Sequence, residues 1–401
     1  MRLRTFLSTV LVVVAAVALA ATATAAPRPA APSIVGPDAT AAGKHTYVFQ
    51  SIERGLAAAR LHYRCSLDSA TLHACAARTT LRLTAGTHVL RVQAVDPAGR
   101  RSPVARLQID VSAVAPELAP KEAWQHTVTA NPIVGLWGTA VGPNGDVYVT
   151  DASADQVVVY DANGNELRRF GSAGTGPGQF QFEKDTDPAD AALPFASIGV
   201  DGRTGDVYVA DSQHVEKFDA QGNFELQWGS PGTGNGQFTR IMDIKVDAAG
   251  VVYVAEDRPK GLGRVQEFDG SGTFRTTFGR GQIVDTGGIE VAPNGDVIVS
   301  DDLANAIHVF GPDGRFEKTI GEPGNLPGQL DFPTGLALDG SKLYVADGDH
   351  DRIVRFDLGS GEPTGYWPVS GSPDSLRLDP SGTSLYVVTD HGVLTKYELP
   401  G

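Results

Sequence analysis

Six copies of one strand pattern predict an all-β chain whose larger part is a β-propeller. Each copy is a turn followed by an apolar, β-branched run that closes in an acidic residue, and the closing acids are 60, 45, 45, 46 and 43 residues apart. They are Asp151, Asp211, Glu256, Asp301, Asp347 and Asp390. A regular period of this length, built from short strands, is typical of stacked four-stranded blades, because one such sheet cannot bury both of its faces alone. Six copies therefore predict six blades.

Each repeat divides into four short strands. An inner strand precedes each copy of the pattern, at residues 139–141, 198–200, 244–246, 289–291, 336–338 and 376–378. Turns such as Pro143-Asn144-Gly145 supply the positive φ that a tight hairpin needs. The third and outer strands end in aromatic residues in most repeats, for example Phe218 and Trp228, and we expect these rings to pack between blades rather than to stack on a ligand.

The two ends of the repeat region are expected to share one blade. The last repeat, residues 375–400, has room for only three strands, and the segment Trp124–Val128 belongs to no full repeat. That segment would supply the missing outer strand and leave no open sheet edge at the point of closure. The propeller is assigned to residues 123–401.

The N-terminus has the pattern of a secretory signal peptide. Arg2 and Arg4 precede an apolar run from Phe6 to Ala20, and the small residues that follow offer a cleavage site after Ala25. The alternative is a membrane anchor, which the short apolar run and the absence of flanking aromatic or basic residues disfavour. We expect residues 1–25 to be removed and the mature chain to be secreted without a membrane span.

The charge of the chain restricts its partners. The formal net charge is −14, and a surface of this sign repels nucleic acid and anionic lipid. The sequence also contains neither a Gly-x-Ser-x-Gly motif nor a phosphate-binding loop with Lys-Ser/Thr, so hydrolase and nucleotide chemistry have no visible support.

Residues 26–32 form a Pro/Ala tether, and residues 33–112 have the alternation of a small β-sandwich. Its strands are expected at residues 45–52, 60–67, 79–83, 88–95 and 105–111. Cys65 and Cys75, the only cysteines, predict one disulfide in an exported protein. A linker rich in Ala and Pro follows at residues 113–122.

The sequence of residues 33–112 is similar to a known class of protein module. The segment Tyr63–Asp68, then Cys75, then the stretch Gly86–Gly99 resembles the immunoglobulin-like modules of secreted bacterial surface proteins, which implies a spacing or adhesive role. The short separation of the cysteines implies a bridge within a local hairpin rather than between two sheets.

Three connections between blades share a Gly-rich loop that ends in Gly-Gln-Phe or Gly-Gln-Leu, at residues 170–180, 228–238 and 320–330. Together with the strands that follow it, this loop resembles the NHL repeat, over roughly residues 124–401. The resemblance implies a six-bladed propeller that serves as a binding scaffold or, among related propellers, as a metal-dependent lyase or lactonase with its site at one mouth of the central channel.

For such an enzyme, the residues that start the inner strands matter most, because a metal at the channel mouth must be held from several blades. The six positions are Gly138, Ser197, Asp243, Gly288, Gly335 and Ser375. They lack the histidines with which related lyases hold zinc, which argues against that activity. Related lactonases bind calcium through oxygen ligands, and here only Asp243, Glu290 and Asp374 are offered near the axis. We expect no cofactor. The one candidate to test is a calcium ion bound by these three residues.

The middle residues of the inner strands are Ala140, Gly199, Lys245, Glu290, Ala337 and Arg377. The charged ones must be paired or reach channel water. One interpretation is a Lys245–Glu290 ion pair with Arg377 hydrated, and the other is a charged pocket for an anionic or zwitterionic ligand. The candidate ligand-binding residues are therefore Lys245, Glu290, Arg377, Asp243 and Asp374.

Two other polar features are given structural or open interpretations. The closing acids occur in every blade, which favours a repeated structural task, such as accepting backbone N–H bonds in the next turn, over a ring of metal ligands. The insertion Glu183–Asp190 lengthens the first interval and is either a recognition loop or solvated surface.

The leading prediction is a secreted two-domain binding scaffold for a protein, peptide or glycan partner. The alternative is an extracellular divalent-metal-dependent lyase or lactonase. Convergence of Asp243, Glu290 and Asp374 on one point would favour the enzyme, and their dispersal would favour the scaffold. A third option, a propeller that only fills space in an envelope assembly, stays open.

Overall fold

The computed structural model describes residues 28–35, 39–41, 43–51, 61–83, 86–112, 119–128, 136–182, 196–211, 213–257, 263–326, 328–390 and 392–400. The predicted signal peptide and the insertion at residues 183–190 lie outside these ranges. Residues 113–118 of the expected linker lie outside them as well. The described part consists of β-strands and one 3-10 turn, η2 (Gly348–His350). It has no helix with the length and hydropathy that a membrane crossing requires.

The first eight strands form two sheets. A three-stranded sheet has the order β1-β3-β6, and a five-stranded sheet has the order β2-β8-β7-β4-β5. The strands are β1 (Ser33–Val35), β2 (Ala39–Ala41), β3 (Gly43–Gln50), β4 (His62–Leu67), β5 (His73–Cys75), β6 (Arg78–Leu83), β7 (Gly86–Val95) and β8 (Ala105–Ser112). The five predicted strands are thus present, and β1, β2 and β5 are additional. The disulfide Cys65–Cys75 joins β4 to its antiparallel neighbour β5, so the bridge lies within a local hairpin as expected.

The rest of the chain forms six four-stranded antiparallel sheets, which are the six predicted blades. Blades 1 to 3 contain β10 (Leu136–Val141), β11 (Val147–Asp151), β12 (Gln156–Tyr160) and β13 (Glu166–Phe170); β14 (Ser197–Val200), β15 (Val207–Ala210), β16 (Val215–Phe218) and β17 (Phe224–Trp228); and β18 (Arg240–Val246), β19 (Val252–Asp257), β20 (Arg264–Phe268) and β21 (Phe274–Phe278).

Blades 4 and 5 contain β22 (Thr286–Val291), β23 (Val297–Asp301), β24 (Ala306–Phe310) and β25 (Phe316–Ile320), and β26 (Pro333–Asp339), β27 (Lys342–Asp347), β28 (Arg352–Asp357) and β29 (Pro363–Pro368). Blade 6 contains β30 (Pro373–Leu378), β31 (Ser384–Thr389) and β32 (Val393–Glu398), with β9 (Lys121–Thr127) as its outer strand. The pairing of β9 with β32 confirms the predicted closure of the ring by the early segment.

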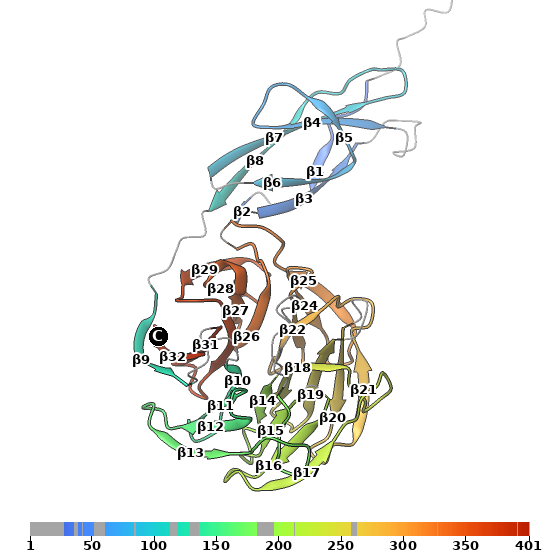
Figure 1. The fold of residues 1–401 in the computed structure, drawn as a ribbon. Coiled ribbons are helices and arrows are strands. Elements are labelled where there is room, and N and C mark those ends of the chain that lie inside the picture. Colours follow the sequence, from blue (N-terminus) through green and yellow to red (C-terminus); the bar gives the residue numbers. More distant parts are fainter. Residues whose placement is uncertain are drawn as a thin grey trace, which may run out of the picture. The chain divides into compact units, whose positions relative to one another are not determined.

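Strand alternation explains why the blades stack into a ring. In β11, Val147 and Val149 pack towards blade 6, whereas Tyr148 between them packs towards blade 2. The same division recurs in the described blades, so that each of six apolar clusters joins two neighbouring sheets. The inner strands follow one another around the axis, and Figure 1 shows them innermost with β13, β17, β21, β25 and β29 at the rim.

The aromatic residues that end the outer strands pack on the next blade, as predicted. Gly222 has a φ of +88°, and a Cβ there would lie 2.9 Å from the ring of Phe170. Trp228 covers Gly272 and Phe278 covers Gly314 in the same way. Only glycine fits these turns, because the backbone is left-handed and the neighbouring ring occupies the space of a side chain. At the closure of the ring, Trp124 makes the equivalent contact with Gly164.

The closing acids have the structural role that their repetition predicted. Each accepts at least one backbone N–H bond, from Ser153, Gln213, Thr239, Val284, Asp331 and Ser372 in blades 1 to 6. In blades 3 to 6 this donor lies in the connection before the inner strand, rather than only in the turn that follows the acid. Several acids also pair with a cationic side chain of the third strand, such as Arg352 beside Asp347 at 2.6 Å.

Blade 2 departs from this pattern at Glu216, which is 3% exposed. Its Oε2 accepts the N–H of Gly178, but its buried Oε1 has no hydrogen-bond partner. Burial, with a smaller contribution from the charge of Asp211, raises the pKa of Glu216 to about 7 even though the N–H of Gly178 lowers it. The equivalent residue of blade 3, Gln266, bonds the same kind of loop through Gly236.

Glu216→Gln is therefore expected to stabilise the propeller, and more so at higher pH. The raised pKa means that the unfolded state loses its proton before the folded state, so the wild type loses stability between about pH 4.5 and 7. We expect the variant to gain roughly 1 to 3 kcal/mol over the wild type across this interval. Chemical unfolding at pH 5 and pH 8 measures the difference, with the exposed Glu317→Gln as control. An equal gain in stability at both pH values would contradict the raised pKa of Glu216 in the folded state.

Candidate functional site

The residues that start the inner strands are set by close contact between blades. A Cβ on Gly138 would lie 2.8 Å from the carbonyl oxygen of Ala196 in blade 2. On Gly288 it would lie 2.7 Å from the oxygen of Thr334, and on Gly335 it would lie 2.5 Å from the nitrogen of Leu376. Backbone of the next blade therefore excludes any side chain, including a metal-binding histidine, from these three positions.

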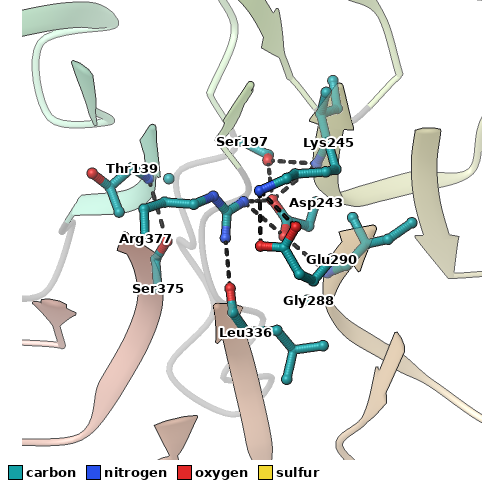
Figure 2. A network of polar contacts seen from close by, with 12 residues as sticks. Thr139, Ser197, Asp243, Lys245, Gly288, Glu290, Leu336, Ser375 and Arg377 are labelled. Atoms are coloured by element: carbon teal, nitrogen blue, oxygen red, sulfur yellow. Dashed lines mark hydrogen bonds and ion pairs between the residues drawn. The ribbon is translucent and has the colours of Figure 1, made fainter. Parts of the chain in front are cut away.

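The three polar residues at the equivalent positions bond to the next blade. The Ser197 hydroxyl accepts the N–H of Ile244, and Asp243 Oδ2 accepts the N–H of Ile289 at 3.0 Å. Ser375 accepts the N–H of Thr139 in the same way. Asp243 lies at an irregularity of register between β18 and β19, and Figure 2 shows its side chain beside Arg377.

Arg377 spans the channel from blade 6 to blade 3 (Figure 2). Its Nη2 donates to both oxygens of Asp243, at 2.8 and 3.0 Å. Its Nη1 donates to the carbonyl oxygen of Leu376 at 2.8 Å. Burial opposes the charge of Arg377, but Asp243 and Glu290 outweigh burial and raise the pKa of the guanidinium above its ordinary value.

Lys245 and Glu290 form the second ion pair of the channel. Lys245 Nζ lies 2.7 and 2.8 Å from the two carboxylate oxygens of Glu290, which belongs to the neighbouring blade. Glu290 Oε1 also accepts the N–H of Val291. This pair is the one predicted from the sequence, but the expected hydration of Arg377 is wrong. Arg377 is only 5% exposed, because Asp243 gives it a partner that sequence reasoning had assigned to a metal.

These contacts leave a calcium ion no suitable ligands at the axis. All four carboxylate oxygens of Asp243 and Glu290 already accept bonds from a cation or a backbone N–H of the chain. In the described ranges, no three His, Cys, Asp or Glu side chains are placed to hold a metal ion. The residues therefore do not fit the calcium site that the sequence offered as an exception.

Asp374, the third residue of that set, has different surroundings from Asp243 and Glu290. It lies at a register shift of β30, and its Oδ2 is buried without a hydrogen-bond partner. Burial raises its pKa well above the ordinary value, and the charge of Asp390 adds to the effect. Asp374 thus neighbours a closing acid, whereas Asp243 and Glu290 meet around Arg377.

The described channel opens into a pocket of about 350 Å³ at the side where the inner strands end. We call this side the end face, and the side where the inner strands begin the start face. The pocket is lined by Ala140, Val141, Gly199, Val200, Gly202, Arg203, Lys245, Val246, Asp247, Ala248, Arg377, Leu378 and Pro380. Small residues on blades 1 and 2 leave the space, and blades 3 and 6 supply Lys245 and Arg377. The lining carries three cationic side chains and one carboxylate.

Of the candidate ligand-binding residues, Lys245 and Arg377 line this pocket, whereas Glu290, Asp243 and Asp374 do not. The small middle residues Ala140 and Gly199 of blades 1 and 2 also belong to the lining. The contribution of Arg203 and Asp247 was not visible, since both lie in turns whose direction the sequence does not show.

Comparisons with known proteins found one family model and several solved structures similar to this chain. A family model described as a 6-bladed beta-propeller matches residues 279–370. A streptogramin B lyase structure is 15% identical, covers 71% of this chain and 90% of its own, and has a TM-score of 0.45. A catalytically inactive virginiamycin B lyase from Staphylococcus aureus with quinupristin is 12% identical, covers 79% and 94%, and has a TM-score of 0.47. No curated protein matches the chain. The match to the family model agrees with the six blades described above.

Proposed function

We propose that this protein is a secreted binding scaffold whose end-face pocket receives an acidic group of a protein, peptide or glycan. The observation that carries the proposal is the set of positioned cationic donors in the pocket. Arg203, Lys245 and Arg377 line it, and each is held by a carboxylate outside the lining, namely Asp201, Glu290 and Asp243 in that order. A concave site with fixed cationic donors orients a ligand of complementary charge.

The ion pairs beneath the pocket make it ready for a carboxylate. Asp243 and Glu290 hold Arg377 and Lys245 in fixed positions, and neither acid lines the pocket. Lys245 is the more accessible of the two, with its side chain 25% exposed. An incoming anion would therefore meet positioned donors, which lowers the entropy lost on binding.

The other parts of the proposal rest on sequence patterns. The repeats are proposed to be NHL repeats, and the N-terminal strands an immunoglobulin-like module that spaces the propeller from its anchor point or partner. Export rests on the signal-peptide pattern of residues 1–25. The alternative, a metal-dependent lyase or lactonase, is less well supported because the carboxylates on the axis are already bonded within the chain.

For the test, the full chain is expressed with residues 1–25 as its leader, and the mature protein is collected from the culture medium. Its recovery there also tests export. The protein is applied to an array of acidic, neutral and basic peptides together with sialylated, uronic-acid and neutral glycans. We expect binding to acidic members only, and weaker binding at higher salt. Equal binding to neutral members would reject the proposed role of the pocket.

A further inference from the structure

A group of carboxylates lies on the start face between blades 3 and 4, at the opposite end of β18 and β19 from the pocket. Asp257 ends β19, Asp285 precedes β22, and Asp302 follows β23. Arg240, at the start of β18, lies beside Asp257 and Asp285. Its Nη2 lies 2.7 Å from Asp257 Oδ2 and 3.8 Å from Asp285 Oδ1. We call these four residues the start-face acidic site.

The bonds within this site do not satisfy all of its acids. Asp257 is 5% exposed and accepts from Arg240 and from the N–H and hydroxyl of Thr286. Asp302 is 6% exposed, yet its buried Oδ1 has no hydrogen-bond partner. A buried acceptor without a donor is costly, and a ligand that brings a donor would remove that cost. The unpartnered oxygen of Asp302 therefore favours a ligand with a hydrogen-bond donor, independently of how many acids the site contains.

Charge is unbalanced in the same place. Burial, a hydrogen bond with Asp257 and the charges of Asp257 and Asp302 together raise the pKa of Asp285 to about 9. Burial and the charge of Asp257 raise the pKa of Asp302 to about 7. Arg240 lowers both values without restoring them. At neutral pH the site thus retains protons that an arriving cation would displace.

The surroundings suit a cation with an apolar stem. Val284 and Leu303 are the sequence neighbours of Asp285 and Asp302, and they are 42% and 63% exposed. Asp285 provides access, because its side chain is 21% exposed. Lys and Arg side chains cover apolar surface with their methylene groups while the charged end meets a carboxylate.

We infer that the start-face acidic site binds the ammonium or guanidinium group of a Lys or Arg side chain on a partner peptide. The site would contact the partner through Asp285 and Asp302, with Val284 and Leu303 against the aliphatic stem. Because this site and the end-face pocket lie at opposite ends of blade 3 and select opposite charges, either can fail without affecting the other.

The test is a calorimetric titration of acetyl-tetralysine amide into the full mature chain at pH 7.5, in phosphate and in HEPES. The expected result is binding with a heat that depends on the buffer, because ionisation of Asp285 releases a proton. In Asp285→Asn/Asp302→Asn, we expect affinity to fall by about tenfold and the buffer dependence to vanish. The control Asp313→Asn/Glu317→Gln removes two exposed carboxylates of blade 4 and should retain both the affinity and the buffer dependence.

Two results would overturn the inference. The first is equal affinity of the Asp285→Asn/Asp302→Asn variant and the wild type, which would place peptide binding elsewhere on the acidic surface. The second comes from titrating calcium chloride in place of the peptide. Calcium binding that this variant loses and that tetralysine does not compete with would make the site a metal site. Unfolding measurements on both variants verify that they are folded before titration.

Discussion

Replacing Arg377 by methionine is expected to destabilise the propeller by about 3 to 5 kcal/mol, because it leaves the buried carboxylate of Asp243 without its cation. Arg377 is 5% exposed and donates to both oxygens of Asp243, so the loss is larger than for a surface pair. Unfolding in urea, followed by tryptophan fluorescence, measures the change. All four tryptophans lie in residues 124–367 and therefore report on the propeller.

Two matched variants show whether the loss comes from the unpaired charge. Arg377→Met/Asp243→Asn removes both charges, and we expect it to regain most of the lost stability, since a neutral pair needs no compensating cation. Lys342→Met removes one partner of an exposed pair with Asp339 at 3.2 Å, where we expect a loss below about 0.5 kcal/mol. If Arg377→Met behaves like Lys342→Met, the cross-channel pair is not a structural element.

Replacing Trp124 by alanine is expected to weaken the closure of the ring by about 2 to 4 kcal/mol, a range typical of truncating a well-packed aromatic residue. The Trp124 ring lies 5.8 Å from that of Tyr386 in blade 6, and its Nε1 donates to the oxygen of Ala162 in blade 1. It thus packs blade 6, to which its own strand β9 belongs, against blade 1.

Calorimetric melting measures this effect, and limited proteolysis locates it. We expect a lower melting temperature and faster cleavage near β9, because β9 pairs on one side only, with β32. Phe316→Ala is the control, since Phe316 lies in blade 4, away from the closure of the ring, and is 40% exposed. An unchanged melting temperature for Trp124→Ala would mean that backbone pairing alone closes the ring.

Much of the fold follows from the sequence because its signals are local and repeated. The period of the closing acids predicts six blades, and the incomplete last repeat predicts that the early strand completes it. The strand β5 (His73–Cys75) was not predicted, because three residues give too short a pattern to distinguish from a loop. Its position beside β4 became clear only from the pairing of Tyr63 with Cys75.

The site was less predictable because it depends on contacts between distant blades. The partner of Lys245 is on the next blade and at the same strand position, so their pairing could be proposed from the repeat. The partner of Arg377 is three blades away and at a different strand position. The repeat pattern does not show contacts between residues three blades apart, and Asp243 was therefore assigned to metal rather than to Arg377.

The central claim is that the end-face pocket binds an acidic group, and a titration of the strongest acidic ligand from the array tests it most directly. The ligand is titrated into the wild type, into Arg203→Gln and Lys245→Met, and into Lys342→Met as the control. The account predicts an affinity at least about tenfold lower for each pocket variant and an unchanged affinity for the control. Equal affinities for all four proteins would contradict it and place recognition on another surface of the chain.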